Sequence, residues 1–443
     1  MKSKFFTLST IAAGLIAASA SPALLANDAS SELERISVTG SYIKRAQNED
    51  ATPLQIIDAS DISASGEITL TDLLRDLTVN TGNSYDEQYT SSFSAGSASV
   101  GLRGLSPKNT LILVNGQRVS NYGFALGTQD TFVDLNALPL GAVERIEVLK
   151  DGASAVYGSD AIAGVINIIL RNNVQSTQFR AGVGGASEGS LTQYSAGVIS
   201  GFGDIAGDGY NLTFSYDYLT RERLNADDRD FTRSGDFRDK PGGRLSGWSS
   251  QGGNYLSDPQ NPQAFENCPG ISEKRDRSDF TPGADGQVCA FNAQPYNTLQ
   301  PEVERHQFSL QGTLQLTEDI QAYSDFLYSN NRSSHVFGAP LSVGAGLRAY
   351  NEETGSLVDI PVELPVGHPD NPGSEALPFE YTFFDVGERV KANKQDFHRF
   401  LAGVNYRGLD WDWSVNVLNS QSRQREYVDN FINRYTFEDM LAS

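Results

Sequence analysis

Residues 307–316 read QFSLQGTLQL, an alternation of apolar and neutral polar side chains that is typical of a β-strand. Similar alternations occur at 211–218, 399–406 and 411–417. Their polar face carries Gln, Asn, Ser and Thr, whereas a soluble β-sandwich usually carries charged side chains on its wet face. A strand with one apolar face toward lipid and one polar face toward an interior is what the wall of a transmembrane β-barrel requires. The pattern therefore predicts membrane-spanning strands.

The spacing of these strands predicts their orientation. Seven strands are expected between residues 172 and 443, at about 175–185, 190–202, 208–221, 302–316, 319–333, 396–408 and 410–425. Two connections are very long, 222–301 and 334–395, and they alternate with tight turns. Outer-membrane barrels have short periplasmic turns and longer extracellular loops. We therefore expect both long connections to be extracellular.

Composition excludes several classes of protein. The chain has 443 residues and a net charge of −21, which disfavours nucleic acid as a partner because phosphates would be repelled. A mean hydropathy of −0.35 disfavours a bundle of membrane helices. Four His and two Cys leave little room for a metal site, and the Ser154 region lacks a nucleophile elbow, so we expect neither a cofactor nor an enzyme.

Residues 51–171 have the texture of a small α+β domain. Leu70, Leu73, Leu74 and Leu77 follow helical spacing, which predicts a short amphipathic helix over 71–77. Apolar runs at 111–114, 145–149 and 164–170 predict strands, and Asn115-Gly116 predicts a hairpin turn because both residues tolerate positive φ. We expect this domain to have a core of its own.

The N-terminus predicts export. Lys2 and Lys4 precede an apolar stretch, and small residues follow, as in a secretory signal peptide over residues 1–26. Cleavage after Ala20 and cleavage after Ala26 both fit. Residues 27–50 form a polar leader with one apolar alternation at 36–40. From the residues alone this segment is either a linker or a strand that pairs with a partner by β-augmentation.

The two cysteines lie in the first long connection. Cys268 and Cys289 would close a ring worth roughly 3 kcal/mol through lost loop-closure entropy. Because an exported chain meets an oxidising compartment, we expect a structural disulfide between them.

Several ordered motifs resemble a known family. Residues 36–45 (ISVTGSYIKR), 100–104 (VGLRG), 110–118 (TLILVNGQR) and 143–152 (VERIEVLKDG), with 162–168 (IAGVINI), are similar to TonB-dependent outer-membrane receptors. The resemblance implies an α+β plug domain followed by antiparallel transmembrane β-barrel strands, here a partial barrel of about seven. Since receptors of this kind have about 22 strands, we expect a truncated or split chain, or missing strands on another polypeptide.

The resemblance also implies function and partners. We expect active uptake of a large, scarce nutrient across the bacterial outer membrane, whether an iron chelate, cobalamin, an oligosaccharide or a peptide. The alternative is a truncated, non-transporting surface-binding protein or remnant. Expected partners are TonB in the periplasm, outer-membrane lipid and the nutrient ligand. The TonB-binding segment, or TonB box, would consist of Ile36, Ser37, Val38, Thr39 and Gly40.

Two further groups of residues are candidates for function inside the barrel. Charged side chains that would anchor the plug to the wall are Arg103, Arg118, Glu144, Arg145 and Glu147. Aromatic side chains that would face the ligand from apical loops are Tyr85, Tyr89, Phe93, Tyr122 and Phe124.

Overall fold

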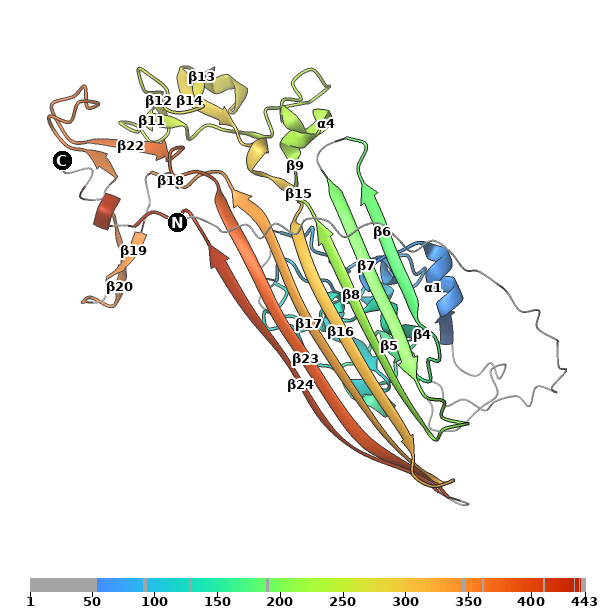
Figure 1. The fold of residues 1–443 in the computed structure, drawn as a ribbon. Coiled ribbons are helices and arrows are strands. Elements are labelled where there is room, and N and C mark those ends of the chain that lie inside the picture. The colour runs from blue at the N-terminus through green and yellow to red at the C-terminus, as the bar shows by residue number, and fades with distance from the viewer. Residues whose placement is uncertain are drawn as a thin grey trace, which may run out of the picture.

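The structure, a computed structural model, describes residues 54–439 apart from 91–93, 128, 189–190, 345–347, 352, 361, 409–410, 434 and 438. The predicted signal peptide, leader and TonB box lie outside the described residues. The described chain forms an N-terminal domain (residues 54–171), a sheet of seven long strands that we call the wall, and two long connections gathered at one end of the wall (Figure 1).

A five-stranded sheet is the frame of the N-terminal domain. Its order is β1-β4-β5-β2-β3, and only β2 and β5 are parallel. The central strand, β5, reads GVINIIL and is almost entirely buried, as expected for a strand covered on both faces. Asn115 and Gly116 form the turn between β2 and β3 with φ of 51° and 74°, as the sequence predicts. The strands are β1 (Leu54–Asp58), β2 (Thr110–Val114), β3 (Gln117–Arg118), β4 (Val143–Leu149) and β5 (Gly164–Leu170).

The helices of this domain are short and capped by side chains. The Asp58 carboxylate accepts hydrogen bonds from the amides of Ser60 (2.8 Å) and Asp61 (3.0 Å) and so starts α1. The Thr69 hydroxyl accepts from Asp72 N (3.1 Å) and starts α2, the helix predicted at 71–77. The helices are α1 (Ala59–Ser65), α2 (Leu70–Arg75) and α3 (Ser154–Tyr157), with 3₁₀ turns at Leu102–Gly104, Pro107–Asn109, Leu135–Ala137 and Leu140–Ala142.

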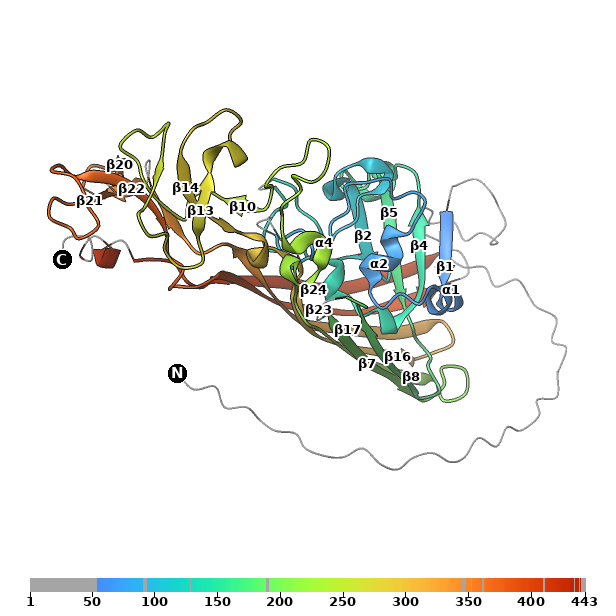
Figure 2. The same cartoon turned by 90° about the horizontal axis from the view of Figure 1, so that it is seen from above.

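The wall is an antiparallel sheet in the order β24-β23-β17-β16-β8-β7-β6. Figures 1 and 2 show the N-terminal domain packed against one of its faces. The seven predicted strands are all present: β6 (Gln178–Gly185), β7 (Thr192–Phe202), β8 (Tyr210–Arg221), β16 (Glu302–Gln315), β17 (Ile320–Gly338), β23 (Arg389–Arg407) and β24 (Asp412–Val428). The predicted fold class, an α+β domain followed by antiparallel barrel strands, is confirmed, and the sheet is open because β6 and β24 do not pair.

The two faces of the wall differ in chemistry. The inner face, toward the N-terminal domain, buries polar side chains such as Ser215, Ser309 and Gln395. The outer face exposes large apolar side chains, and we call this set the apolar belt: Tyr210, Leu212, Tyr216, Leu314, Tyr328, Phe400, Val404, Tyr406, Trp413, Val415 and Val417. Aromatic side chains at both ends of an apolar band are typical of strands that cross a bilayer.

The long connections fold together at one end of the wall (Figure 1). The second connection runs from 339 to 388 and is shorter than the expected 334–395, because β17 and β23 continue past the apolar belt. A sheet in the order β12-β11-β22-β18 takes strands from both connections. Its strands are β11 (Gly253–Tyr255), β12 (Gln263–Ala264), β18 (Ser342–Val343) and β22 (Leu377–Thr382), and β21 (Glu363–Leu364) also pairs with β22.

The remaining elements of the connections are small. They are β9 (Leu224–Asn225), α4 (Asp230–Arg233), β10 (Trp248–Ser249), β13 (Glu273–Asp276), β14 (Gln287–Asn292), β15 (Thr298–Gln300), β19 (Arg348–Asn351) and β20 (Ser356–Asp359), with 3₁₀ turns at Ala226–Asp228, Arg277–Asp279 and Gln294–Tyr296. In the part of the chain that the structure describes, no helix is long and apolar enough to cross a membrane.

Candidate functional site: the interface between the N-terminal domain and the wall

The interface between the two parts is made by side chains. Among the described strands, none of β1–β5 pairs with a strand of the wall. The apolar contact is small: Leu327 of β17 and Phe397 of β23 join the core cluster of the N-terminal domain, where they are 0% and 1% exposed. The other contacts described below are polar. The two parts are therefore docked without a shared hydrogen-bonded ladder.

The first polar contact lies at the end of the strand β2. Arg399, on the inner face of β23, forms a buried ion pair with Asp325 of β17. Its Nη2 also donates to the backbone carbonyl of Val114 (3.1 Å), and Asn115 Nδ2 donates to Asp325 Oδ2 (3.4 Å). The side chains of Arg399 and Asp325 are 0% and 4% exposed. A buried pair of this kind places the β2–β3 turn against the wall.

The second polar contact surrounds Glu87. Arg221 of β8 and Arg305 of β16 lie 3.2 and 3.7 Å from Glu87 Oε1, and Asn136 Nδ2 donates to Oε2 (3.2 Å). Burial raises the pKa of Glu87, but the two guanidinium groups outweigh burial and hold its pKa below the ordinary value. Glu87 therefore stays ionised and links the N-terminal domain to two strands of the wall.

Asp134 lies beside this cluster, and its pKa is shifted in the opposite direction. It accepts hydrogen bonds from the amides of Ala98 (2.9 Å) and Asn136 (3.1 Å) through one oxygen. Burial raises its pKa to about 7, although the two amides and the nearby Arg305 act in the opposite direction. The pKa values of these two carboxyl groups at one interface are thus shifted in opposite directions.

The backbone of the N-terminal domain approaches β17 closely at Gly96. Its carbonyl accepts a hydrogen bond from Asn331 Nδ2 of β17 (3.4 Å), and its φ is +82°. A Cβ atom at this position would lie 1.9 Å from Ser333 Oγ. Only glycine fits this contact, because it has no Cβ and accepts a positive φ without strain.

A cavity of about 540 Å³ separates α1 and α2 from β6–β8. Ile62, Glu67 and Leu138 line it from the N-terminal domain, and Phe179 lines it from the wall. Arg180 crosses its border, donating to the Gly141 carbonyl (3.1 Å) and to Asp217 Oδ1 (2.6 Å). The two parts are therefore separated by a cavity here, whereas around Glu87 and Arg399 they are in direct, buried contact.

The N-terminal domain matches the TonB-dependent Receptor Plug Domain family over residues 46–165. It is a TonB-dependent receptor plug domain. The match begins just before β1 and ends within β5, so the whole plug sheet except the end of that strand lies inside it.

Two curated relatives are similar to parts of this chain. The vitamin B12 transporter BtuB of Vibrio cholerae serotype O1 is 34% identical over 200 residues, which cover 43% of this chain and 30% of the transporter. The ferric enterobactin receptor PirA of Pseudomonas aeruginosa is 40% identical over 131 residues, 28% of this chain and 17% of the receptor. The chain therefore matches less than a third of the length of these relatives.

The comparison with solved structures gives matches with TM-scores below 0.5. A mutant of the ferric enterobactin receptor PfeA of Pseudomonas aeruginosa has a TM-score of 0.39 and 15% identity, covering 85% of this chain and 49% of that one. The siderophore receptor PirA of Acinetobacter baumannii has a TM-score of 0.35 and 16% identity, covering 84% of this chain and 48% of that one.

The charged residues expected to anchor the plug domain form pairs inside it. Arg103 donates to the Ile162 carbonyl (2.8 Å) and lies 3.7 Å from Asp151. Arg118 pairs with Asp160 and donates to the Tyr157 carbonyl (2.8 Å). These two side chains thus tie the plug loops to each other.

The same holds for the pairs on β4. Arg145 lies 3.1 Å from Glu144 and 2.9 Å from Glu147, both on its own strand. The anchoring role of Arg103, Arg118, Glu144, Arg145 and Glu147 stays a prediction. Among the described residues, the ion pairs between the plug domain and the wall are made by Glu87 with Arg221 and Arg305.

The aromatic residues expected to face a ligand divide into two groups. Tyr122 is buried, and its ring stacks on Phe132 with centroids 5.5 Å apart, so it supports the loop. Tyr89 and Phe124 are 46% and 36% exposed. The ring of Tyr85 packs against that of Tyr89, with centroids 5.0 Å apart. Phe93 lies outside the described residues.

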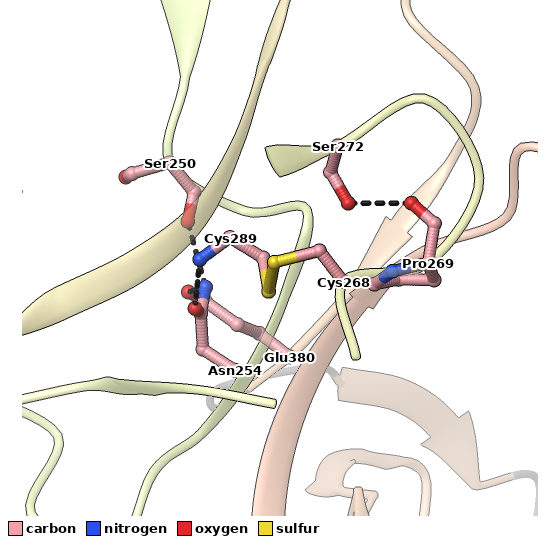
Figure 3. The surroundings of a disulfide bond; sticks show 7 residues. All are labelled: Ser250, Asn254, Cys268, Pro269, Ser272, Cys289 and Glu380. Carbon is pink, nitrogen blue, oxygen red and sulfur yellow. Dashed lines mark hydrogen bonds between the residues drawn. A yellow bond between two sulfur atoms is a disulfide. The ribbon is translucent and has the colours of Figure 1, made fainter. Parts of the chain in front are cut away.

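The two cysteines are joined in the structure, with Cα atoms 5.4 Å apart (Figure 3). Asn254 of β11 lies beside the bridge: its Oδ1 accepts from Cys289 N (2.8 Å), and its Nδ2 donates to Glu380 of β22 (2.6 Å). The disulfide thus lies where the two long connections meet.

Proposed function

We propose that this protein is a TonB-dependent receptor of the bacterial outer membrane that takes up a large, scarce nutrient. The observation that carries the proposal is that side chains of the wall hold the plug domain, without strand pairing between the described strands. A domain held in this way is able to leave the wall as a unit, because no sheet has to be broken. Transport through a plugged barrel requires such a movement.

The work for this movement must come from outside the outer membrane, which has neither ATP nor an ion gradient of its own. The segment 36–40 supplies a handle, since an extended strand pairs with a partner through main-chain hydrogen bonds. TonB is the proposed partner in the periplasm. In this orientation the short turns of the wall face the periplasm, and the two long connections face the medium.

The named relatives indicate the class of ligand. One is a vitamin B12 transporter and the other a ferric enterobactin receptor. Both names describe large, scarce nutrients, and an iron chelate or a cobalamin is accordingly the first choice for this protein. Oligosaccharides and peptides remain in the proposal as the next classes.

Proline in the box tests the proposal. Val38→Pro removes one main-chain donor from the segment that would pair with TonB. We expect uptake to be lost while ligand binding by intact cells stays unchanged. Asn48→Pro, in the same leader but outside the box, is the matched control and should transport normally. Normal uptake by Val38→Pro would show that residues 36–40 do not couple the receptor to TonB.

A further inference from the structure

The plug–wall cavity, the space of about 540 Å³ between α1, α2 and β6–β8, lies where the wall presents small residues. Arg180 of β6 reaches the plug domain and so marks the inner face of that strand, and Gly182 lies two residues further on the same face. Gly182 is opposite Ser195 of β7, and Gly197 follows on the same face of β7. These positions carry no bulky side chain, so the wall leaves room opposite the two helices. The volume is within the range of about 300–1,000 Å³ that is typical of ligand pockets.

One of these glycines makes room for an ion pair at the border of the cavity. A Cβ atom at Gly197 would lie 2.5 Å from Asp217 Oδ1 and 2.9 Å from Arg180 Nη2. The two charged groups are 2.6 Å apart and neutralise each other. Asp217 therefore repels an anion in the cavity less than an unpaired carboxylate would.

A buried guanidinium group with an unused donor also lines the cavity. Arg305 of β16 is part of the lining, and its side chain is 4% exposed. Its Nε donates to Asn331 Oδ1 (3.5 Å), and its Nη2 lies 3.7 Å from Glu87 Oε1, which is too far for a hydrogen bond. Within the part of the chain that the structure describes, Nη2 has no hydrogen-bond partner. A buried charged donor without an acceptor is costly, and an anionic oxygen in the cavity would remove that cost.

The charges around Arg305 favour an anion over a cation. Glu87 is shared by two guanidinium groups, those of Arg305 and Arg221. Burial raises the pKa of the neighbouring Asp134 to about 7, so this carboxyl group is only partly ionised at neutral pH. Glu67 lines the plug side of the cavity, and burial is the main cause that raises its pKa as well. The end of the cavity at Arg305 therefore has an excess of positive charge.

We propose that the plug–wall cavity binds an amphipathic organic anion, such as a carboxylate on a ring system. Its charged oxygen would accept a hydrogen bond from Arg305 Nη2, and Arg171 of the plug domain adds a second cation to the lining. Its apolar body would lie against Ile62 and Leu140 of the plug domain and Leu219 of β8. A ligand in this position touches both parts of the molecule and would stabilise the docking of the plug domain on the wall. The site is separate from nutrient uptake, and its binding is measured without transport.

Fluorine NMR on the full chain in detergent tests the proposal, with a fluoronaphthoate and its uncharged carboxamide as the two probes. The probes have almost the same shape, and empty micelles give the blank for each. We expect the carboxylate to bind about tenfold more tightly than the carboxamide, because hydrogen bonds between charged groups are roughly twice as strong as those between neutral groups.

Two variants locate the bound probe, and each has a matched control. Arg305→Gln should bind both probes with equal affinity, whereas Arg332→Gln, which removes a 56% exposed cation from β17, should keep the preference for the carboxylate. Ser195→Phe should fill the cavity and abolish binding of both probes. Ser324→Phe should bind both as the unmodified protein does, because Ser324 precedes the inward-facing Asp325 and so faces outward.

Each other result overturns the proposal. Equal affinity of the unmodified protein for the two probes would show that the cavity does not recognise an anion. A preference that survives Arg305→Gln, or binding that survives Ser195→Phe, would place the probe elsewhere on the protein. Absence of binding at millimolar probe concentrations would show that the cavity holds only water.

Discussion

Arg399 of the wall donates a hydrogen bond to the backbone carbonyl of Val114, the last residue of β2 in the plug domain (3.1 Å). The two residues are 285 positions apart. The same guanidinium is paired with Asp325, so one buried cation serves both a neighbouring strand and the plug domain. Arg399 is thereby placed to hold the plug domain against β23 and β17.

Arg399→Ala should loosen the plug domain. It leaves the Asp325 carboxylate buried without its cation, which typically costs about 3–5 kcal/mol, and it removes the contact to Val114. We expect a lower unfolding temperature and faster hydrogen exchange in β2. The double variant R399M/D325L should recover much of the stability, since removing both charges avoids an unpaired one. Unchanged exchange in β2 with Arg399→Ala would contradict the role of this residue.

Gly96→Ala should displace the plug loop from β17. The new Cβ would lie 1.9 Å from Ser333 Oγ. Gly116→Ala is the matched control, because Gly116 also has a positive φ (74°) but a Cβ added there would have nothing within 4 Å. Both variants carry backbone strain of about 1 kcal/mol, and only Gly96→Ala adds the clash. Unfolding by urea in detergent should therefore show a larger loss of stability for Gly96→Ala than for Gly116→Ala. Equal losses would show that Ser333 moves aside without cost.

Asp134 should make stability depend on pH. Its pKa is about 7 in the folded protein and near 3.8 in the unfolded chain. The folded state therefore binds the proton more tightly, and stability falls as pH rises from about 4 to 7 and is level above that. The whole effect corresponds to about 4 kcal/mol.

Unfolding of Asp134→Asn across this pH range measures the effect. In the variant, the free energy of unfolding should no longer fall with pH over this range. Compared with the unmodified protein, the variant should therefore perform better at pH 8 than at pH 5. Asp130→Asn is the control, since a hydrogen bond from Lys108 lowers the pKa of Asp130, and its contribution is lost only in stronger acid. A profile for Asp134→Asn that parallels the unmodified protein would place the Asp134 pKa at its ordinary value.

Peptide mapping should find Cys268 linked to Cys289 in exported protein. Alkylation without reductant should label neither residue, and alkylation after reduction should label both. Replacing the pair by serine should destabilise the connections by roughly 3 kcal/mol while leaving the wall intact, because the bridge lies outside it. Two free thiols in the exported protein would refute the linkage.

The strands of the wall could be predicted because one face of each meets an apolar environment. Leu310 and Leu314 in β16, for example, alternate with Gln and Ser or Thr. The extension of β23 back to Arg389 was not predicted, because Lys391 and Lys394 lie beyond the apolar belt, where the alternation of hydropathy ends. The sheet that the two long connections form together was also not predicted, because short polar strands have no periodic hydropathy pattern.

The partners of charged residues were harder to predict than the fold. Arg103 and Arg118 occur in motifs, but a motif does not show which of many carboxylates a guanidinium will meet. A different signal was present: charged side chains, among them Arg305, Asp325 and Arg399, occupy inward positions of the wall, where most side chains are neutral. A charge at such a position must find a partner or face the plug domain, and these three do.

The sheet β12-β11-β22-β18 has a consequence for how receptors of this kind diversify. Gly253–Tyr255 from the first connection pairs with Phe379–Tyr381 from the second, and Asn254 bonds Glu380 across the join. If one connection were replaced by that of another receptor, the strands of the remaining connection would lose their pairing partners in this sheet. Under the proposed function, recombination or drift that changes the ligand specificity of the long connections should therefore replace both connections together, so that the two segments share one evolutionary history.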